Sequence, residues 1–104
     1  MSEIKIQSEY EDLDKYEYDD GDIFYLKKDT DILHNPYGPA AIHADGRTEY
    51  LLEHKYHRLD GPARIWADGY EQYYINNEYL SKEEFEMHPE RLKFLGKEYL
   101  ICLT

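Results

Sequence analysis

The sequence has little cysteine, few basic residues and no long hydrophobic run. Cys102 is the only cysteine among 104 residues, which excludes an internal disulfide and fits a reducing cytoplasm. No window of about 18 apolar residues occurs, so we expect no transmembrane helix and no membrane partner. The first residues lack a basic segment followed by an apolar one, so we expect no signal peptide.

The sequence also lacks the residue patterns of common enzymes and metal sites. It has no glycine-rich phosphate loop, and its serines occur only at positions 2, 8 and 81. The acidic run Asp19–Asp22 does not fit a calcium loop, because the first ligand positions fall on tyrosines. His54 and His57 have a zinc-like spacing but no second ligand pair. We therefore predict a non-enzymatic protein with no cofactor and no metal.

The charge is strongly negative and unevenly distributed. There are 23 Asp and Glu against 12 Lys and Arg, and the net charge is −11, which disfavours direct nucleic-acid binding. Residues 1–31 alone carry −7, and their densest part, Glu9–Asp22, is interrupted by tyrosines. A hydrophobic fraction of 41% with 12 tyrosines is enough for one folded domain over residues 1–104.

An internal repeat is the strongest pattern in the chain. The segment from His34 to Gly46 aligns without a gap with the segment from His57 to Gly69, an offset of 23 residues. Both copies contain Gly-Pro-Ala and Ala-Asp-Gly, and the match continues through paired tyrosines. A degraded earlier copy is indicated around Asp20-Gly21, which lacks Gly-Pro-Ala.

The repeat predicts antiparallel strands joined by tight turns. Asp-Gly between short apolar segments is typical of a two-residue type I′ hairpin loop, and Asn76-Asn77 has the same turn chemistry. Such a loop at Asp68-Gly69 places Ile65 opposite Gln72. It puts Arg64, Trp66, Tyr73 and Ile75 on one face of the hairpin and Ile65, Tyr70 and Tyr74 on the other.

The fold class predicted is mainly β, an antiparallel meander of repeated β-hairpins with one short helix near 81–88. Ser81 and Glu84 form a capping box at the start of that helix. We expect an acidic N-terminal segment over 1–31, tandem hairpin repeats over 34–56 and 57–80, and a helix plus C-terminal hairpin over 81–104. The last hairpin is inferred because Phe94–Leu100 resembles Tyr74–Leu80.

The segment His57-Arg-Leu-Asp-Gly-Pro-Ala63, followed by Asp68-Gly69 and Tyr73-Tyr-Ile-Asn-Asn77, resembles the MORN-like repeats of uncharacterised bacteriophage and large-virus proteins. The resemblance covers about residues 34–86. Asn77 stands where that family usually has glycine, and Tyr73 where it often has tryptophan. It implies a β-hairpin repeat and a viral source, and it transfers no catalytic residue.

Charge and aromatic content together predict a protein that acts by binding. We expect a small acidic phage protein that binds a basic surface of a host protein in the host cytoplasm. It would inhibit a defence system as an anti-CRISPR or anti-restriction protein, through DNA mimicry in one form. The predicted partner-binding residues are Glu9, Glu11, Asp12, Asp14, Tyr16, Glu17, Tyr18, Asp19, Asp20, Asp22, Trp66 and Tyr70.

Three alternatives stay open at this point. The acidic segment is also typical of a solvated face that only keeps the protein soluble, which is the usual role of a run of charge. Exposed strands would suit a structural or assembly module that forms a homo-oligomer. An aromatic pocket would suit a protein that sequesters a small ligand such as a nucleotide.

Overall fold

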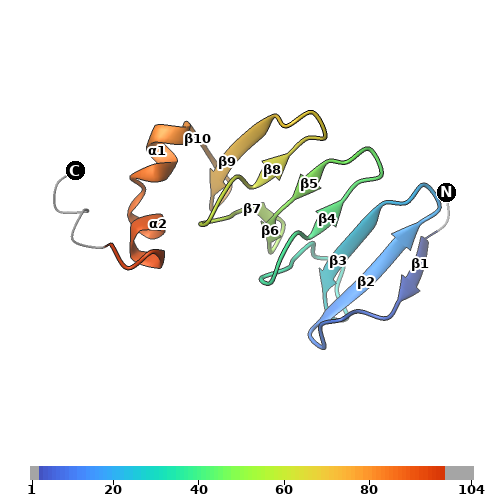
Figure 1. Ribbon diagram of the computed structural model, residues 1–104. Coiled ribbons are helices and arrows are strands. Elements are labelled where there is room, and N and C mark those ends of the chain that lie inside the picture. Colours follow the sequence, from blue (N-terminus) through green and yellow to red (C-terminus); the bar gives the residue numbers. More distant parts are fainter. Residues whose placement is uncertain (1–2, 98–104) are drawn as a thin grey trace.

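The computed structural model describes residues 3–97, which form an elongated β-sheet followed by two short helices (Figure 1). The molecule measures 51 × 31 × 19 Å along its principal axes. The strands are β1 (Glu3–Ile6), β2 (Leu13–Tyr18), β3 (Ile23–Lys27), β4 (Ala41–Ile42), β5 (Thr48–Glu49), β6 (Leu51–Leu52), β7 (Lys55–Tyr56), β8 (Arg64–Ile65), β9 (Glu71–Ile75) and β10 (Glu78–Leu80). The helices are α1 (Lys82–Glu86) and α2 (Pro89–Phe94).

Eight of these strands form one antiparallel sheet in the order β1-β2-β3-β4-β5-β8-β9-β10. The remaining pair, β6 and β7, forms a separate two-stranded ribbon. The predicted mainly β meander with a short helix is confirmed. None of the helices within residues 3–97 is long and apolar enough to cross a membrane.

Three hairpins share one turn geometry, and it differs from the predicted one. In each hairpin, the last hydrogen bond before the turn joins the residue two positions before Asp to the residue directly after Gly. In the third hairpin, Trp66 N–H donates to the Tyr70 carbonyl at 2.9 Å. The loop therefore contains three residues and ends on a glycine with φ between 92° and 97°. The other two hairpins close between Tyr18 and Asp22 and between His43 and Arg47.

The aspartate in each turn explains why the loop has three residues. Asp20, Asp45 and Asp68 each accept the backbone N–H two residues later, at 2.9–3.0 Å. This bond is an Asx-turn, which holds the aspartate outside the left-handed region that a type I′ loop needs. The predicted two-residue loop is wrong, although its position is right.

The longer loop shifts the strand register by one residue. Ile65 lies opposite Glu71 and Arg64 opposite Gln72. Tyr70 and Tyr74 consequently share a face with Arg64 and Trp66, while Tyr73 and Ile75 lie on the other face. The predicted division of these side chains between the two faces is wrong, because a change of one residue moves every side chain across the sheet.

Repeat-equivalent hydrogen bonds connect successive copies. His54 N–H donates to the Leu33 carbonyl, and Asn77 N–H donates to the Tyr56 carbonyl, both at 2.8 Å. Tyr25 and Tyr50 make matching bonds to the carbonyls of Ala40 and Ala63, at 2.8 and 2.7 Å. The β2–β3 hairpin thus has the same turn, and the same hydrogen bond to the following copy, as the hairpin of the first full repeat, although its sequence is degraded.

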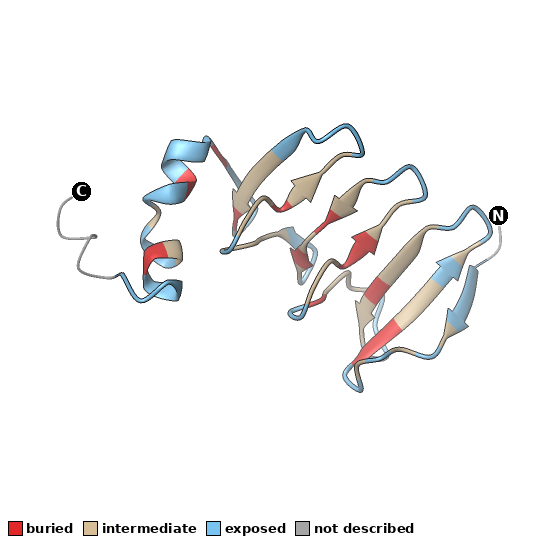
Figure 2. Cartoon of the chain, viewed as in Figure 1, coloured by how far each residue is buried: buried red, intermediate tan, exposed pale blue. Residues whose placement is uncertain are grey.

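Two small clusters of buried hydrophobic side chains occur, one in the first repeat and one between the second repeat and α1, and Figure 2 shows buried segments in both parts of the molecule. Ala40 and Ala41 pack against Leu51 of the β6–β7 ribbon. Phe85 of α1 packs against Ile75 and Leu80, with its ring 4.6 Å from that of Tyr73. The predicted capping box at Ser81 is present, with Glu84 N–H donating to the Ser81 hydroxyl at 3.1 Å.

The predicted C-terminal hairpin is wrong where the structure describes it. Phe94 ends α2, which begins after His88 with Pro89 in its first turn. Gly96 then takes a left-handed φ of 74°, and Lys97 N–H bonds with the Leu92 carbonyl at 2.8 Å, which closes the helix. Residues 98–100, the rest of that predicted hairpin, lie outside the described residues.

Candidate functional site

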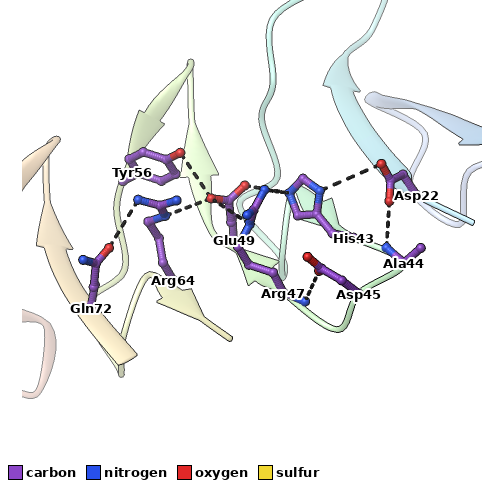
Figure 3. A network of polar contacts seen from close by, with 9 residues as sticks. All are labelled: Asp22, His43, Ala44, Asp45, Arg47, Glu49, Tyr56, Arg64 and Gln72. Atoms are coloured by element: carbon purple, nitrogen blue, oxygen red, sulfur yellow. Dashed lines mark hydrogen bonds and ion pairs between the residues drawn. The ribbon is translucent and has the colours of Figure 1, made fainter. Parts of the chain in front are cut away.

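One face of the sheet carries a row of polar side chains that crosses its centre (Figure 3). The row consists of Asp22 and His43, which flank β3 and β4, followed by Glu49 of β5, Arg64 of β8 and Gln72 of β9. We call this surface the polar-row face. Cross-strand alignment follows from the register, which puts Glu49 opposite both Ala41 and Arg64 on its two neighbouring strands.

Glu49 is the centre of the polar row and is only 6% exposed. Its carboxylate lies 2.8 Å from His43 Nε2 and 2.8 Å from Arg64 Nε, and it accepts a bond from the Tyr56 hydroxyl at 3.2 Å. Burial opposes ionisation of this carboxyl, but the His43 hydrogen bond and the Arg64 charge outweigh it. The pKa of Glu49 is therefore lowered.

The neighbours of Glu49 are themselves occupied. Arg64 Nη1 donates to Gln72 at 3.2 Å, and His43 Nδ1 lies 4.0 Å from the Asp22 carboxylate. Asp22 also accepts the Ala44 N–H at 2.7 Å. The side chains of the row bind one another, so their main effect is to hold five strands in register.

An aromatic patch lies beside the polar row at the third hairpin. Trp66 and Tyr70 are 5.3 Å apart between ring centroids, and Tyr74 and Tyr79 are 5.4 Å apart. The Arg64 guanidinium lies 4.7 Å from the Trp66 ring and links the patch to the row. Tyr70 and Tyr79 are 54% and 58% exposed, and the proximity of Tyr70 raises the pKa of Tyr79. We call Trp66, Tyr70, Tyr74 and Tyr79 the aromatic patch.

A groove of about 480 Å³ lies on the same face at the other end of the row. Tyr16, Tyr18 and Phe24 line it, and the Tyr18 and Phe24 rings meet edge-on at 5.3 Å. Glu3 and Asp31 place carboxylates on its wall. A hydrogen bond to Glu3 raises the pKa of Tyr18. We call this feature the acidic groove.

The structure divides the predicted acidic segment into two groups. Glu9, Glu11 and Asp12 precede β2, whereas Asp19, Asp20 and Asp22 follow it, and Glu17 lies near its end. A six-residue strand separates them by about 20 Å. The segment that is continuous in sequence therefore presents negative charge at both ends of the first hairpin.

Several predicted site residues already have internal partners. Asp14 is 5% exposed, lies 3.3 Å from Lys5 and accepts the Asp29 N–H at 2.9 Å, and that backbone bond lowers its pKa. Glu9 accepts the Tyr25 hydroxyl at 2.8 Å. Asp12 accepts the Tyr37 hydroxyl at 2.9 Å. Glu11 and Glu17 are exposed.

The tyrosines and the tryptophan of the predicted site fall into two places. Tyr16 and Tyr18 line the acidic groove, while Trp66 and Tyr70 belong to the aromatic patch. From β2 to β8 the sheet spans four strand spacings, about 19 Å. All four residues lie on the polar-row face, so one extended ligand surface reaches both places.

Sequence reasoning missed Glu49 and its partners. Glu49 aligns with Gln72 at the repeat offset, so the repeat gives no charge signal at this position. His43 and Arg47 align with Trp66 and Tyr70 in the same way. One sequence signal could have indicated the site: Glu49 stands between short apolar strand segments. A carboxylate buried there requires cationic neighbours, which would have pointed to a charged cluster.

The repeated histidines have a structural role in the turns. Nδ1 of His34 accepts the Glu53 N–H and Nδ1 of His57 accepts the Asn76 N–H, both at 3.0 Å. Burial disfavours the charged form of each imidazole and is the main reason that the pKa values of His34 and His57 are lowered. His54 accepts the Leu33 N–H at 3.2 Å. Over residues 3–97, no three His, Cys, Asp or Glu side chains gather as a metal site.

Comparison of the chain with protein-family models, with curated proteins and with solved structures finds no match. Its function is therefore inferred from the surface of this molecule. The resemblance to phage and viral repeats stays an expectation from the motifs.

Proposed function

We propose that this protein acts by binding a partner protein with a basic surface through its polar-row face. The observation that carries the proposal is the arrangement of that face. An aromatic groove with carboxylates lies at one end and an exposed aromatic patch at the other. In a chain of net charge −11, a basic partner is the complementary one.

The two ends of the face would contribute different terms to binding. Tyrosine and tryptophan supply contact area at a small cost in side-chain entropy. The carboxylates around the first hairpin attract a basic partner over about 10 Å at 0.1 M salt and speed its association. The polar row between them keeps both in a fixed relative position.

The form of this proposal that we favour is an inhibitor of a host defence complex, such as a CRISPR or restriction nuclease, in the host cytoplasm. It is supported by the phage-like repeat and by the acidic residues at the two ends of β2, which would compete with DNA phosphates for a basic cleft. We propose no catalytic step, because the charged groups of the polar row are already bound to one another.

The test is capture from bacterial lysate with the full chain immobilised. Two surface variants address the two ends of the face: Tyr18→Ser with Asp31→Asn, and Tyr70→Ser with Tyr79→Ser. The matched control is Glu83→Gln with Glu86→Gln on α1, which removes exposed charge elsewhere. Captured proteins are identified by mass spectrometry, and their affinity is then measured as a function of salt.

The proposal is supported if the captured protein has a basic surface and binds each of the two face variants about tenfold or more weakly than it binds the unmodified protein. Its affinity should also fall as the salt concentration rises. The control variant should bind as the unmodified protein does. Binding that is equal in all variants, or an acidic captured protein, contradicts the proposal. A bound nucleotide in native mass spectrometry would favour sequestration of a small ligand instead.

A further inference from the structure

The outer side of β1 is an open strand edge at one end of the sheet (Figure 1). Among the strands of residues 3–97, β2 alone pairs with β1. Glu3, Ile4 and Lys5 are exposed, and Ile4 is 61% exposed. At the opposite end the chain continues past β10 into α1, whose Phe85 packs onto the sheet. An open edge with an exposed apolar side chain is suited to pairing with another strand.

The hydrogen-bond alternation decides which groups of β1 face outward. The N–H groups of Tyr18 and Lys28 bond to the carbonyls of Asp22 and Asp12, so even-numbered residues of β2 bond with β3. Successive residues of an antiparallel strand bond to opposite sides, so the odd-numbered residues bond with β1. Their β1 partners are Ile4 and Ile6. The N–H and C=O groups of Glu3 and Lys5 therefore point to the open side.

We infer that two copies of this chain pair antiparallel through β1, with a two-fold axis at Ile4. In this register Glu3 of each copy lies opposite the second copy's Lys5, and the outward backbone groups of these residues bond to one another. Ile4 lies opposite the second copy's Ile4 in a non-hydrogen-bonded pair, with Cα atoms about 4.5 Å apart. The occupant of the edge is thus a second copy, and the two sheets become one.

Charge complementarity selects both the second copy and the register. Opposite charges placed directly across two strands stabilise the pair, and like charges destabilise it. A register centred on Lys5 uses the same outward groups but places lysine opposite lysine. A lysine on an edge normally prevents pairing with other strands. Here the same lysine permits pairing with its own strand, because Lys5, which also lies 3.3 Å from Asp14 in its own copy, meets Glu3 of the second copy.

The size and charge of the interface predict a weak dimer. The self-paired segment is short, so the buried area lies at the small end for specific interfaces. Each copy carries −11, so the two molecules repel one another at long range. We expect a dimer fraction that rises with protein concentration. This inference does not rest on the proposed function: pairing uses the outward backbone groups of β1 and leaves the aromatic patch exposed, although Glu3 also lines the acidic groove.

A cysteine pair tests the register directly. In a Cys102→Ser background, Ile4→Cys should form an intermolecular disulfide on mild oxidation, because the paired Cα atoms would lie within disulfide reach. Ile6→Cys is the matched control on the same strand and the same face. In the inferred register the Cα atoms of residue 6 in the two copies are about 13 Å apart along the strands, beyond the roughly 7 Å limit for a disulfide.

Sedimentation equilibrium over a concentration series tests the association itself. Glu3→Lys replaces both Glu–Lys pairs by Lys–Lys pairs, and we expect the association constant to fall about tenfold. Glu78→Lys on β10 makes the same change in net charge away from this edge and is the reference. Lys5→Pro removes an outward N–H and keeps the backbone bonds between β1 and β2, although it also removes the Lys5–Asp14 ion pair, and it should weaken association.

The inference is supported when the protein forms dimers and Ile4→Cys cross-links much faster than Ile6→Cys. It is overturned when the protein stays monomeric at every concentration or the two cysteine variants cross-link equally. It is also overturned when species larger than dimers accumulate, since these indicate head-to-tail pairing. Circular dichroism of each variant verifies that it is folded, and Ile4→Cys changes only an exposed side chain.

Discussion

Arg64 and Glu49 face each other across β8 and β5, with Arg64 Nε 2.8 Å from a carboxylate oxygen of Glu49. Both residues belong to an internal ion-pair network in a protein whose net charge is −11. Most of its carboxylates lie at the surface, whereas Glu49 is buried and surrounded by His43, Arg47 and Arg64. This pair holds adjacent repeats together and keeps the polar-row face in one arrangement.

Replacement of Glu49 by glutamine should destabilise the protein. The substitution leaves the Arg47 and Arg64 guanidinium groups without their shared anion, and loss of one partner of a buried pair typically costs roughly 3 kcal/mol. Urea unfolding followed by circular dichroism measures the free energy of unfolding. Glu71→Gln changes an exposed residue at the start of β9; it is the control and should change that free energy by less than about 0.5 kcal/mol. An equal effect of the two substitutions contradicts a central role for Glu49.

The lowered pKa of Glu49 predicts loss of stability in acid. Because the folded-state pKa lies below the unfolded value near 4.3, the stabilisation is complete above that pH and disappears as pH falls through the folded-state pKa. The free energy of unfolding of the unmodified protein should therefore fall below about pH 4.3, and that of Glu49→Gln should fall less steeply. Parallel slopes would show that other carboxyls control acid stability.

His34 and His57 predict a second pH effect, nearer neutrality. Their pKa values are lowered in the folded state, so the unfolded chain binds more protons between the folded pKa and about 6.5. Stability should fall as pH falls through that window, because a protonated ring cannot accept the turn N–H. Chemical denaturation from pH 7.5 to 5.5 measures this slope. The double variant His34→Gln and His57→Gln should lose most of it, and Glu49→Gln should retain it.

Close stacking of neighbouring turns predicts unequal effects of two glycine substitutions. A Cβ on Gly46 would lie 2.7 Å from the Ala67 Cβ, whereas a Cβ on Gly69 would meet nothing within 4 Å. Both have positive φ, so each alanine costs about 1–2 kcal/mol from the backbone alone. Gly46→Ala should cost roughly 1–3 kcal/mol more, because the turns must separate. Thermal unfolding of the two variants compares them, and similar melting temperatures would contradict the close contact.

The repeat predicts reciprocal substitutions at Glu53 and Asn76, which are equivalent positions with left-handed backbone, φ 48° and 50°. Asparagine tolerates this conformation better than glutamate does. Glu53→Asn should stabilise the protein by about 0.5 kcal/mol, and Asn76→Glu should destabilise it by more, because the Asn76 amide also donates to the Glu90 carboxylate. The exposed Glu53–Lys27 pair offsets little of this gain. Changes of the same sign in the two variants would contradict the equivalence.

The predictions that rested on residues close together in the sequence were the accurate ones. Asp45-Gly46 and Asp68-Gly69 marked hairpin turns, Asn76-Asn77 marked a tight turn, and the capping box at Ser81 marked a helix start. Glu53-His54 was missed as a turn although it aligns with Asn76-Asn77, because neither residue type is typical of left-handed backbone. Two bonds from its N–H groups, to His34 and to the Leu33 carbonyl, hold it there.

The candidate site was only partly accessible from sequence. Tyr18, Trp66 and Tyr70 do lie on an exposed or grooved face, but the register error assigned Trp66 and Tyr70 to opposite faces. The acidic segment was treated as one surface, yet β2 separates its two ends. Asp14 shares the face of Tyr16 and Tyr18, but it is buried because its carboxylate is bound to Lys5 and to the Asp29 N–H.

Local chemistry in the sequence determined the period of 23 residues, the places where the chain turns, the strongly negative charge and the antiparallel β architecture. Each of these depends on residues within a few positions of one another, or on composition. Only the tertiary structure decided the loop length, and through it which side chains share a face. It also brought Asp22, His43, Glu49, Arg64 and Gln72 together from five segments of the chain, because ion pairing across a sheet depends on the register of every intervening strand.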